Sequence, residues 1–142
     1  MITKFVNSKL IIKSLIIIMI LSASIEIIAQ EKNQLTLKDF KIVIEKTETG
    51  IKMQSLNGSA WTNLTFSTNN DKPQAIDEYG MTDLGKVSTK KDSNLSDFLF
   101  TITKTEARIV LQGFEGTAWT NLSFTLTENA KQTINQFGMT EN

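Results

Sequence analysis

Two tryptophan–asparagine pairs contain the side chains in this sequence best suited to ligand binding. Trp61 is followed two residues later by Asn63, and Trp119 is followed in the same way by Asn121. An indole ring can stack on a sugar ring while the neighbouring amide bonds the sugar hydroxyl groups. The alternative is that each tryptophan packs in the core or at an interface and donates its indole N–H to a carbonyl. These four residues are the candidate ligand-binding residues, and both interpretations remain open.

The expected strand geometry bears on this choice. On a regular strand Trp61 and Asn63 share the face opposite to Leu64 and Phe66, because side chains alternate between the two faces. Trp61 would then point away from the covered core, which favours a ligand or an interface. A bulge near Gly58 would remove this argument.

Acidic residues are the remaining candidates for chemistry, because the chain contains no histidine and no cysteine. The pair Asp77-Glu78 becomes Asn135-Gln136 at the corresponding place later in the chain, so a solvated face is a better explanation than an active site. Asp39 and Asp97 each precede a predicted strand, where aspartate commonly caps a turn. We therefore predict no catalytic residue, no metal site and no cofactor, and we do not expect an enzyme.

An internal repeat organises the chain. A shift of 58 positions aligns residues 39–82 with 97–140 without a gap, and 20 of the 44 aligned pairs are identical. A similarity of this extent indicates a duplication. The most similar segments are Gly58–Phe66 with Gly116–Phe124, and Tyr79–Thr82 with Phe137–Thr140.

The repeated pattern G-[ST]-A-W-T-N-L-[ST]-F, followed by [YF]-G-M-T, resembles a unit of small exported bacterial proteins of unassigned function. Those proteins carry one such unit after a signal peptide, whereas this chain carries it twice over almost its whole mature length. The resemblance implies export and a shared structural unit. It supplies no activity and no catalytic or binding residue.

Hydrophobic periodicity predicts three strands in each repeat. Apolar residues alternate with other residues from Phe40 to Glu45 and from Phe98 to Ile102, as in a half-buried strand. The second predicted strands are Ile51–Leu56 and Ile109–Phe114, and the third are Thr62–Thr68 and Thr120–Thr127.

A short helix is predicted to end each repeat. Gln74–Tyr79 and Gln132–Phe137 place apolar residues three positions apart, and Gly80 and Gly138 follow directly. This pattern is typical of an amphipathic helix with a C-terminal glycine. The predicted fold class is α+β, with two tandem β-β-β-α units packed with pseudo-twofold symmetry and a mainly antiparallel sheet.

The first 29 residues have the order of a secretory signal peptide. Three lysines precede the apolar run Leu15–Leu21, and cleavage is expected after Ala29, with Ser24 as the alternative site. A retained membrane anchor is the other possibility, although Lys13 and Glu26 would be costly in lipid. The predicted organisation is a signal peptide at 1–29, a first repeat at 30–83, a linker at 84–96 and a second repeat at 97–142.

The mature chain has little net charge. Removal of residues 1–29 leaves 12 basic and 14 acidic residues, a net charge of −2, so nucleic acid is not an expected partner. We expect a periplasmic or secreted protein that is not lipid-anchored and that contacts the membrane only through its signal peptide. The favoured function is a non-enzymatic binding or interaction module with an unknown protein or glycan partner. The alternatives are an assembly component of the envelope and a carbohydrate-binding protein that uses Trp61 and Trp119.

Overall fold

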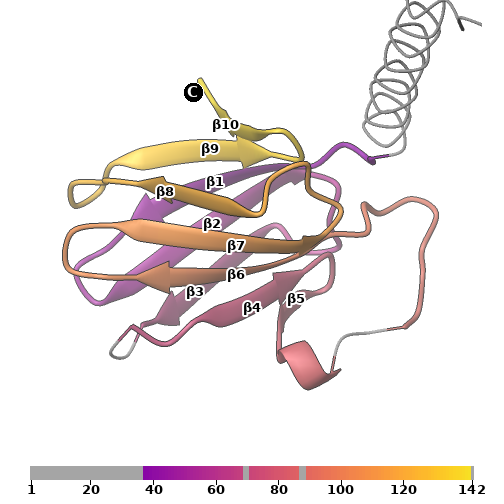
Figure 1. Cartoon of the computed structure of the whole chain (residues 1–142), viewed down its shortest axis with the longest axis horizontal. Coiled ribbons are helices and arrows are strands. Elements are labelled where there is room, and N and C mark those ends of the chain that lie inside the picture. The colour runs from indigo at the N-terminus through magenta and orange to yellow at the C-terminus, as the bar shows by residue number, and fades with distance from the viewer. Residues whose placement is uncertain (1–36, 69–70, 87–88, 142) are drawn as a thin grey trace, which may run out of the picture. The chain divides into compact units, whose positions relative to one another are not determined.

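A computed structural model describes residues 37–68, 71–86 and 89–141, and Figure 1 shows their arrangement. The predicted signal peptide lies outside the described residues. Within these ranges the elements are β1 (Lys41–Lys46), β2 (Gly50–Asn57), β3 (Asn63–Ser67), β4 (Gln74–Asp77), β5 (Gly80–Thr82), the 3-10 helix η1 (Leu84–Lys86), β6 (Leu99–Lys104), β7 (Ile109–Glu115), β8 (Asn121–Phe124), β9 (Lys131–Asn135) and β10 (Gly138–Thr140).

Two five-stranded antiparallel sheets are built, and each contains strands of both repeats. The strand orders are β10-β9-β1-β2-β3 and β5-β4-β6-β7-β8. The first three strands of a repeat lie side by side, whereas its last two strands cross to the other sheet, where β9 pairs with β1 and β4 pairs with β6 (Figure 1). In these orders β1, β2 and β3 correspond to β6, β7 and β8. In the same way, β9 and β10 correspond to β4 and β5. The two repeats therefore have equivalent topologies and exchange their terminal hairpins.

The core lies between the two sheets. Ile42 and Ile44 of β1 and Phe100 and Ile102 of β6 are fully buried, and they belong to one hydrophobic cluster that draws on both sheets. These residues occupy every second position of β1 and of β6, so their side chains point into the layer between the two sheets, as in a β-sandwich. The equivalent residues Phe40 and Phe98 meet with ring centroids 4.7 Å apart. The repeats thus share a single core.

The predicted helices are wrong, and with them the α+β fold class, because the fold is all-β apart from η1. Gln74–Tyr79 forms β4 and the turn of a hairpin with β5, and Gln132–Phe137 lies in the equivalent hairpin of β9 and β10. Gly80 and Gly138, with φ of 130° and 131°, close these turns and do not cap helices. A strand forms here because β6 and β1 each offer an open edge to which it can bond. Among the described residues, no helix is long and apolar enough to cross a bilayer.

The segment that connects the repeats folds back onto the first repeat. The backbone N–H of Ser96 donates to the Gly58 carbonyl at 2.8 Å, and the Ser96 hydroxyl donates to the Asp39 carbonyl. The Tyr79 hydroxyl donates to the Lys90 carbonyl at 3.0 Å. The described part of the connector therefore helps to position the β4–β5 turn.

Candidate functional site

Both tryptophans point their indole N–H groups into the structure. Trp61 Nε1 donates to the Asp77 carbonyl and Trp119 Nε1 donates to the Asn135 carbonyl, each at 3.0 Å. Trp119 is buried, with 8% of its surface exposed, while Trp61 is half-buried and packs against the core cluster. Each indole thus joins the segment just before the third strand of its repeat to the terminal hairpin in the opposite sheet.

The segment that is most similar between the repeats, residues 58–66 and 116–124, acts as a clamp on that hairpin. The Ala60 N–H donates to the Glu78 carbonyl at 2.8 Å, and the equivalent Ala118 N–H donates to the Gln136 carbonyl at 2.7 Å. Gly58 begins the clamp with a φ of 91°, and a Cβ there would lie 2.7 Å from the Asp39 carbonyl oxygen. Glycine is therefore required by both the backbone angle and the close approach. These bonds explain the strong similarity of Gly58–Phe66 and Gly116–Phe124.

The asparagines do not share a surface with the tryptophan rings. Trp61 precedes β3, which begins at Asn63, and a register shift between β1 and β2 lies just before Gly58. The regular-strand geometry assumed from the sequence therefore does not hold for Trp61. Asn63 is exposed on the outer face, where it pairs with Gln54, and Asn121 is exposed at the equivalent place. The structure therefore does not bring the four sequence-predicted site residues together in one binding site, because the indoles pack inward and the asparagines lie on the outer faces.

A shallow polar hollow lies beside Asn63 on the outer face of the first sheet. Its volume is about 120 Å³, and Lys52, Gln54 and Lys131 contribute to its lining. The nearby charges are partly compensated, because Lys131 Nζ lies 3.8 Å from a Glu45 carboxylate oxygen. A hollow of this size can hold a few water molecules but does not enclose a ligand.

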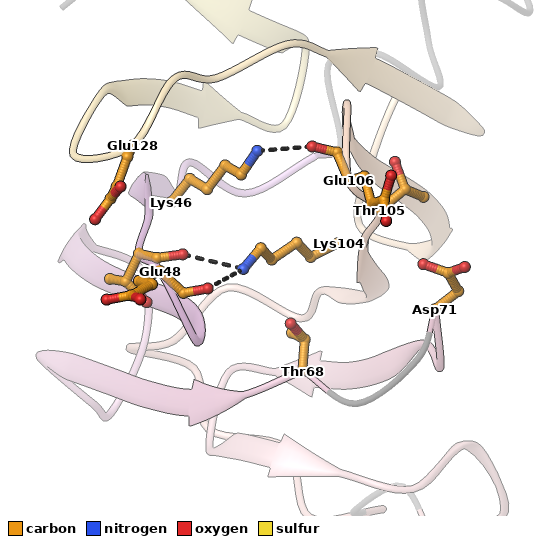
Figure 2. A pocket seen from close by; sticks show the side chains of 9 residues that line it. Lys46, Glu48, Thr68, Asp71, Lys104, Thr105, Glu106 and Glu128 are labelled. Atoms are coloured by element: carbon orange, nitrogen blue, oxygen red, sulfur yellow. Dashed lines mark hydrogen bonds between the residues drawn. The ribbon is translucent and has the colours of Figure 1, made fainter.

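A larger polar hollow lies where the tips of the β1–β2 and β6–β7 hairpins meet. It has a volume of about 570 Å³ and is drawn in Figure 2. Lys46 Nζ donates to the Glu106 carbonyl at 3.0 Å, and Lys104 Nζ donates to the carbonyls of Thr47 and Glu48 at 3.0 and 2.9 Å. Each lysine therefore crosses from its own hairpin to the tip of the other, as the dashed lines in Figure 2 show.

The sequence did not predict this reciprocal lysine pair, although the motif Lys-Thr-Glu recurs at residues 46–48 and 104–106. The recurrence of the motif at a spacing of 58 was the available signal. Both ammonium groups already bond to carbonyls, and the hollow contains carboxylates of either repeat, including Glu48 and Glu128. Within the described ranges, no group of three or more acidic side chains is arranged to hold a metal ion. The arrangement is therefore better explained as a hydrogen-bonded link between the two hairpins than as a reaction centre.

Exposed apolar side chains recur at equivalent positions of the two repeats. Tyr79 and Met81 of the β4–β5 hairpin are 37% and 50% exposed, and this pair is called the first tip. Phe137 and Met139 of the β9–β10 hairpin are 55% and 50% exposed, and this pair is called the second tip. A third pair, Leu56 and Phe114, lies at the β-bulges of β2 and β7. Leu84 is the one exposed large apolar residue of the described chain without such a counterpart.

Comparison of the chain with protein-family models, with curated proteins and with solved structures gives no match. The function must therefore be inferred from the side chains of this molecule alone. The apolar tips are a surface feature that both repeats have in common.

Proposed function

We propose that this protein is an exported, non-enzymatic interaction module that binds a protein partner through its two apolar tips. The observation that carries the proposal is the recurrence of exposed apolar residues in pairs 58 residues apart, at Tyr79 and Phe137 and at Met81 and Met139. Fewer than half of the aligned positions of the repeats are identical, so the retention of these surface residues is selective. Aromatic residues and methionine are enriched in protein interfaces.

Two equivalent tips favour a partner that presents its binding surface more than once. When one tip is bound, the second binds as an intramolecular event, and avidity can exceed single-site affinity by about 10² to 10⁴-fold. A partner such as an oligomeric or repetitive envelope protein would meet this condition. Because the tips belong to paired β-hairpins, their backbone is already ordered before binding.

A glycan partner is less well supported than a protein partner. Stacking on sugar would need an open indole face beside the amide, whereas Trp119 is buried and Asn121 lies on the outer face of its sheet. An assembly role in the envelope would use the same apolar tips for self-association. Light scattering on the mature protein distinguishes that role, because an interaction module without assembly activity stays at its monomer mass.

Affinity capture with tip variants tests the proposal. The mature protein and a quadruple variant, Tyr79→Ser, Met81→Ser, Phe137→Ser and Met139→Ser, are immobilised and exposed to envelope extracts. A partner captured by the wild type should be reduced at least tenfold by the quadruple variant, because buried aromatic contacts are each worth about 1–2 kcal/mol. A variant of one tip alone should lose most of the avidity.

A matched control changes exposed polar residues that lie away from the tips, through Asn63→Ser and Asn121→Ser. This control should capture the partner as the wild type does. Equal capture by the wild type and the quadruple variant would rule out the tips as the binding surface. Export is tested separately, by sequencing the N-terminus of the protein recovered outside the cytoplasm, where Gln30 is expected as the first residue.

A further inference from the structure

Gln136 uses both the nitrogen and the oxygen of its side-chain amide in hydrogen bonds at the turn of the second tip. It is 5% exposed, its Nε2 donates to Asp39 Oδ1 at 2.6 Å, and its Oε1 accepts the Phe40 N–H at 3.2 Å. The amide therefore supplies both the donor and the acceptor that the start of β1 requires. These contacts join the β9–β10 turn of the second repeat to the first strand of the first repeat.

The residue equivalent to Gln136 in the first tip is Glu78, and the residue equivalent to Asp39 is Asp97. Glu78 is also 5% exposed, and its carbonyl accepts the Ala60 N–H just as the Gln136 carbonyl accepts the Ala118 N–H. The strand register next to it is equivalent as well, since Asp77 pairs with Leu99 as Asn135 pairs with Lys41. The backbone thus places Glu78 at the position that Gln136 occupies in the other repeat. The acceptor role differs, because the Phe98 N–H, the equivalent of the Phe40 N–H, donates to the Ser96 carbonyl at 3.0 Å.

Replacement of the amide by a carboxyl group removes the donor. Asp97 Oδ1, the counterpart of the oxygen bonded by Gln136, is buried and has no hydrogen-bond partner. A buried acceptor without a donor is costly. A protonated Glu78 has the O–H group that could satisfy it, in the same way that one carboxyl of a closely spaced pair retains its proton.

Several charged groups surround the pair. Lys38, which precedes β1, lies 3.5 Å from Asp97 Oδ2, and Lys91 of the connector lies 3.7 Å from Asp97 Oδ1 and 3.9 Å from Glu115 of β7. These distances exceed that of a hydrogen bond, and both lysine side chains are about half exposed, so their attraction is screened by water.

Asp77 of β4 is adjacent, and its Oδ1 already accepts the N–H groups of Tyr79 and Gly80. Burial is the main cause that raises the pKa of Glu78, and the Asp77 and Asp97 carboxylates raise it further. The Glu78 backbone N–H and Lys91 act in the opposite direction. The Tyr79 hydroxyl, the remaining titratable group of the turn, is bonded to the Lys90 carbonyl.

We propose that Glu78 retains its proton and donates its O–H to the buried Asp97 Oδ1, and that loss of this proton to solvent loosens the first tip from β6. The second tip lacks this property because Gln136 does not titrate. One end of the molecule is therefore sensitive to pH and the other is not. This inference goes beyond the proposed function and does not depend on it, because it concerns the attachment of the turn and not what the tip binds.

The direction of the pH effect follows from the raised pKa. The folded state binds the Glu78 proton more tightly than the unfolded state, in which the pKa has its ordinary value near 4.5. The stabilisation is fully present below pH 4.5 and is lost as the pH rises through the higher folded-state pKa. Because one proton is involved, the contribution to the unfolding equilibrium constant is at most about tenfold per pH unit within this window.

Two exchange variants test the proposal on the full mature chain. Glu78→Gln copies the second repeat, and its stability in urea should lose the component that falls with pH above 4.5. Gln136→Glu copies the first repeat and should add a second component of the same sign. A carboxyl-carbon NMR titration of the wild type should show Glu78 ionising above the ordinary glutamate value near 4.5.

Amide exchange provides a local reading with an internal control. With rising pH, the protection factors of Ala60, Tyr79 and Gly80 should fall severalfold relative to those of Ala118, Phe137 and Gly138. In Glu78→Gln this difference should disappear. An ordinary Glu78 titration, or equal protection of the two turns across the pH range in the wild type, would overturn the proposal. The NMR titration needs no variant, so it decides the matter even if Glu78→Gln is poorly folded.

Discussion

Asp77 and Asn135 show how the same turn tolerates a change of charge. Each supplies an Oδ1 atom that accepts the next two turn N–H groups, and Asn135 bonds Phe137 and Gly138 at 2.8 and 3.1 Å. An oxygen acceptor is needed here and a negative charge is not. The sequence interpretation of Asp77-Glu78 as a solvated face is wrong, because the two residues are only 3% and 5% exposed. The sequence did not predict that these residues lie in a hairpin turn. That position explains why Asn135-Gln136 can replace them, since an amide oxygen accepts the same turn N–H groups.

The tryptophans provide a prediction at the same scale. Trp119→Phe should lower the free energy of unfolding by about 1–3 kcal/mol, because it removes the bond to the Asn135 carbonyl and part of a buried ring. Trp61→Phe should cost less, about 0.5–1.5 kcal/mol, at its half-buried position. Urea denaturation measures both values. The indole that remains in Trp61→Phe should emit at a shorter wavelength than the one that remains in Trp119→Phe, and the reverse order would contradict the observed burial.

At the scale of elements, the first three strands of each repeat could be predicted and the terminal hairpins could not. Ile42 and Ile44 alternate with polar or half-buried neighbours, and this local pattern is enough to specify a strand with one buried face. The segment Gln74–Tyr79 is too short for its period to distinguish a helix from a strand. Its structure is decided by β6, which it meets only after the chain has passed through the connector.

The reciprocal lysine pair carries a prediction about the hairpin tips. Lys46→Met and Lys104→Met keep the aliphatic part of the side chain but remove the donors, so each should lower the free energy of unfolding by about 0.5–1.5 kcal/mol. Lys104→Met should cost more, since Lys104 bonds two carbonyls. Thermal and urea unfolding measure the change, with the exposed Lys41→Met as the matched control. Costs no larger than that of the control would mean that the lysines do not fasten the tips.

At the scale of the whole molecule, the exchange of hairpins makes the two repeats interdependent. The pseudo-repeat was evident from the sequence, but self-similarity is equally compatible with two side-by-side units and with two units that exchange strands. The distinction depends on pairings such as Ile42 with Ile134 and Phe100 with Ile76, which join different repeats. No local pattern encodes these partners.

Separation of the repeats tests this arrangement. Fragments 37–86 and 89–142 should each fail to fold as a monomer, because each would lack the hairpin that completes its sheet and about half of the shared core. Mixed together, they should recover β-sheet circular dichroism and form a one-to-one complex by light scattering. A single fragment that gives a dispersed NMR spectrum at its monomer mass would show that a repeat is self-sufficient. The intact chain should unfold in one cooperative transition.

The pairing of Val43 with Thr133 also bears on how the chain is made. During synthesis, β1 has to wait for a partner ninety positions downstream, so the sheet β10-β9-β1-β2-β3 cannot be completed until β9 and β10 have been made. Pairings this distant slow folding and leave a strand edge open to other chains in the meantime. For the export proposed above, the same delay would keep the nascent chain unfolded enough to enter a translocation channel.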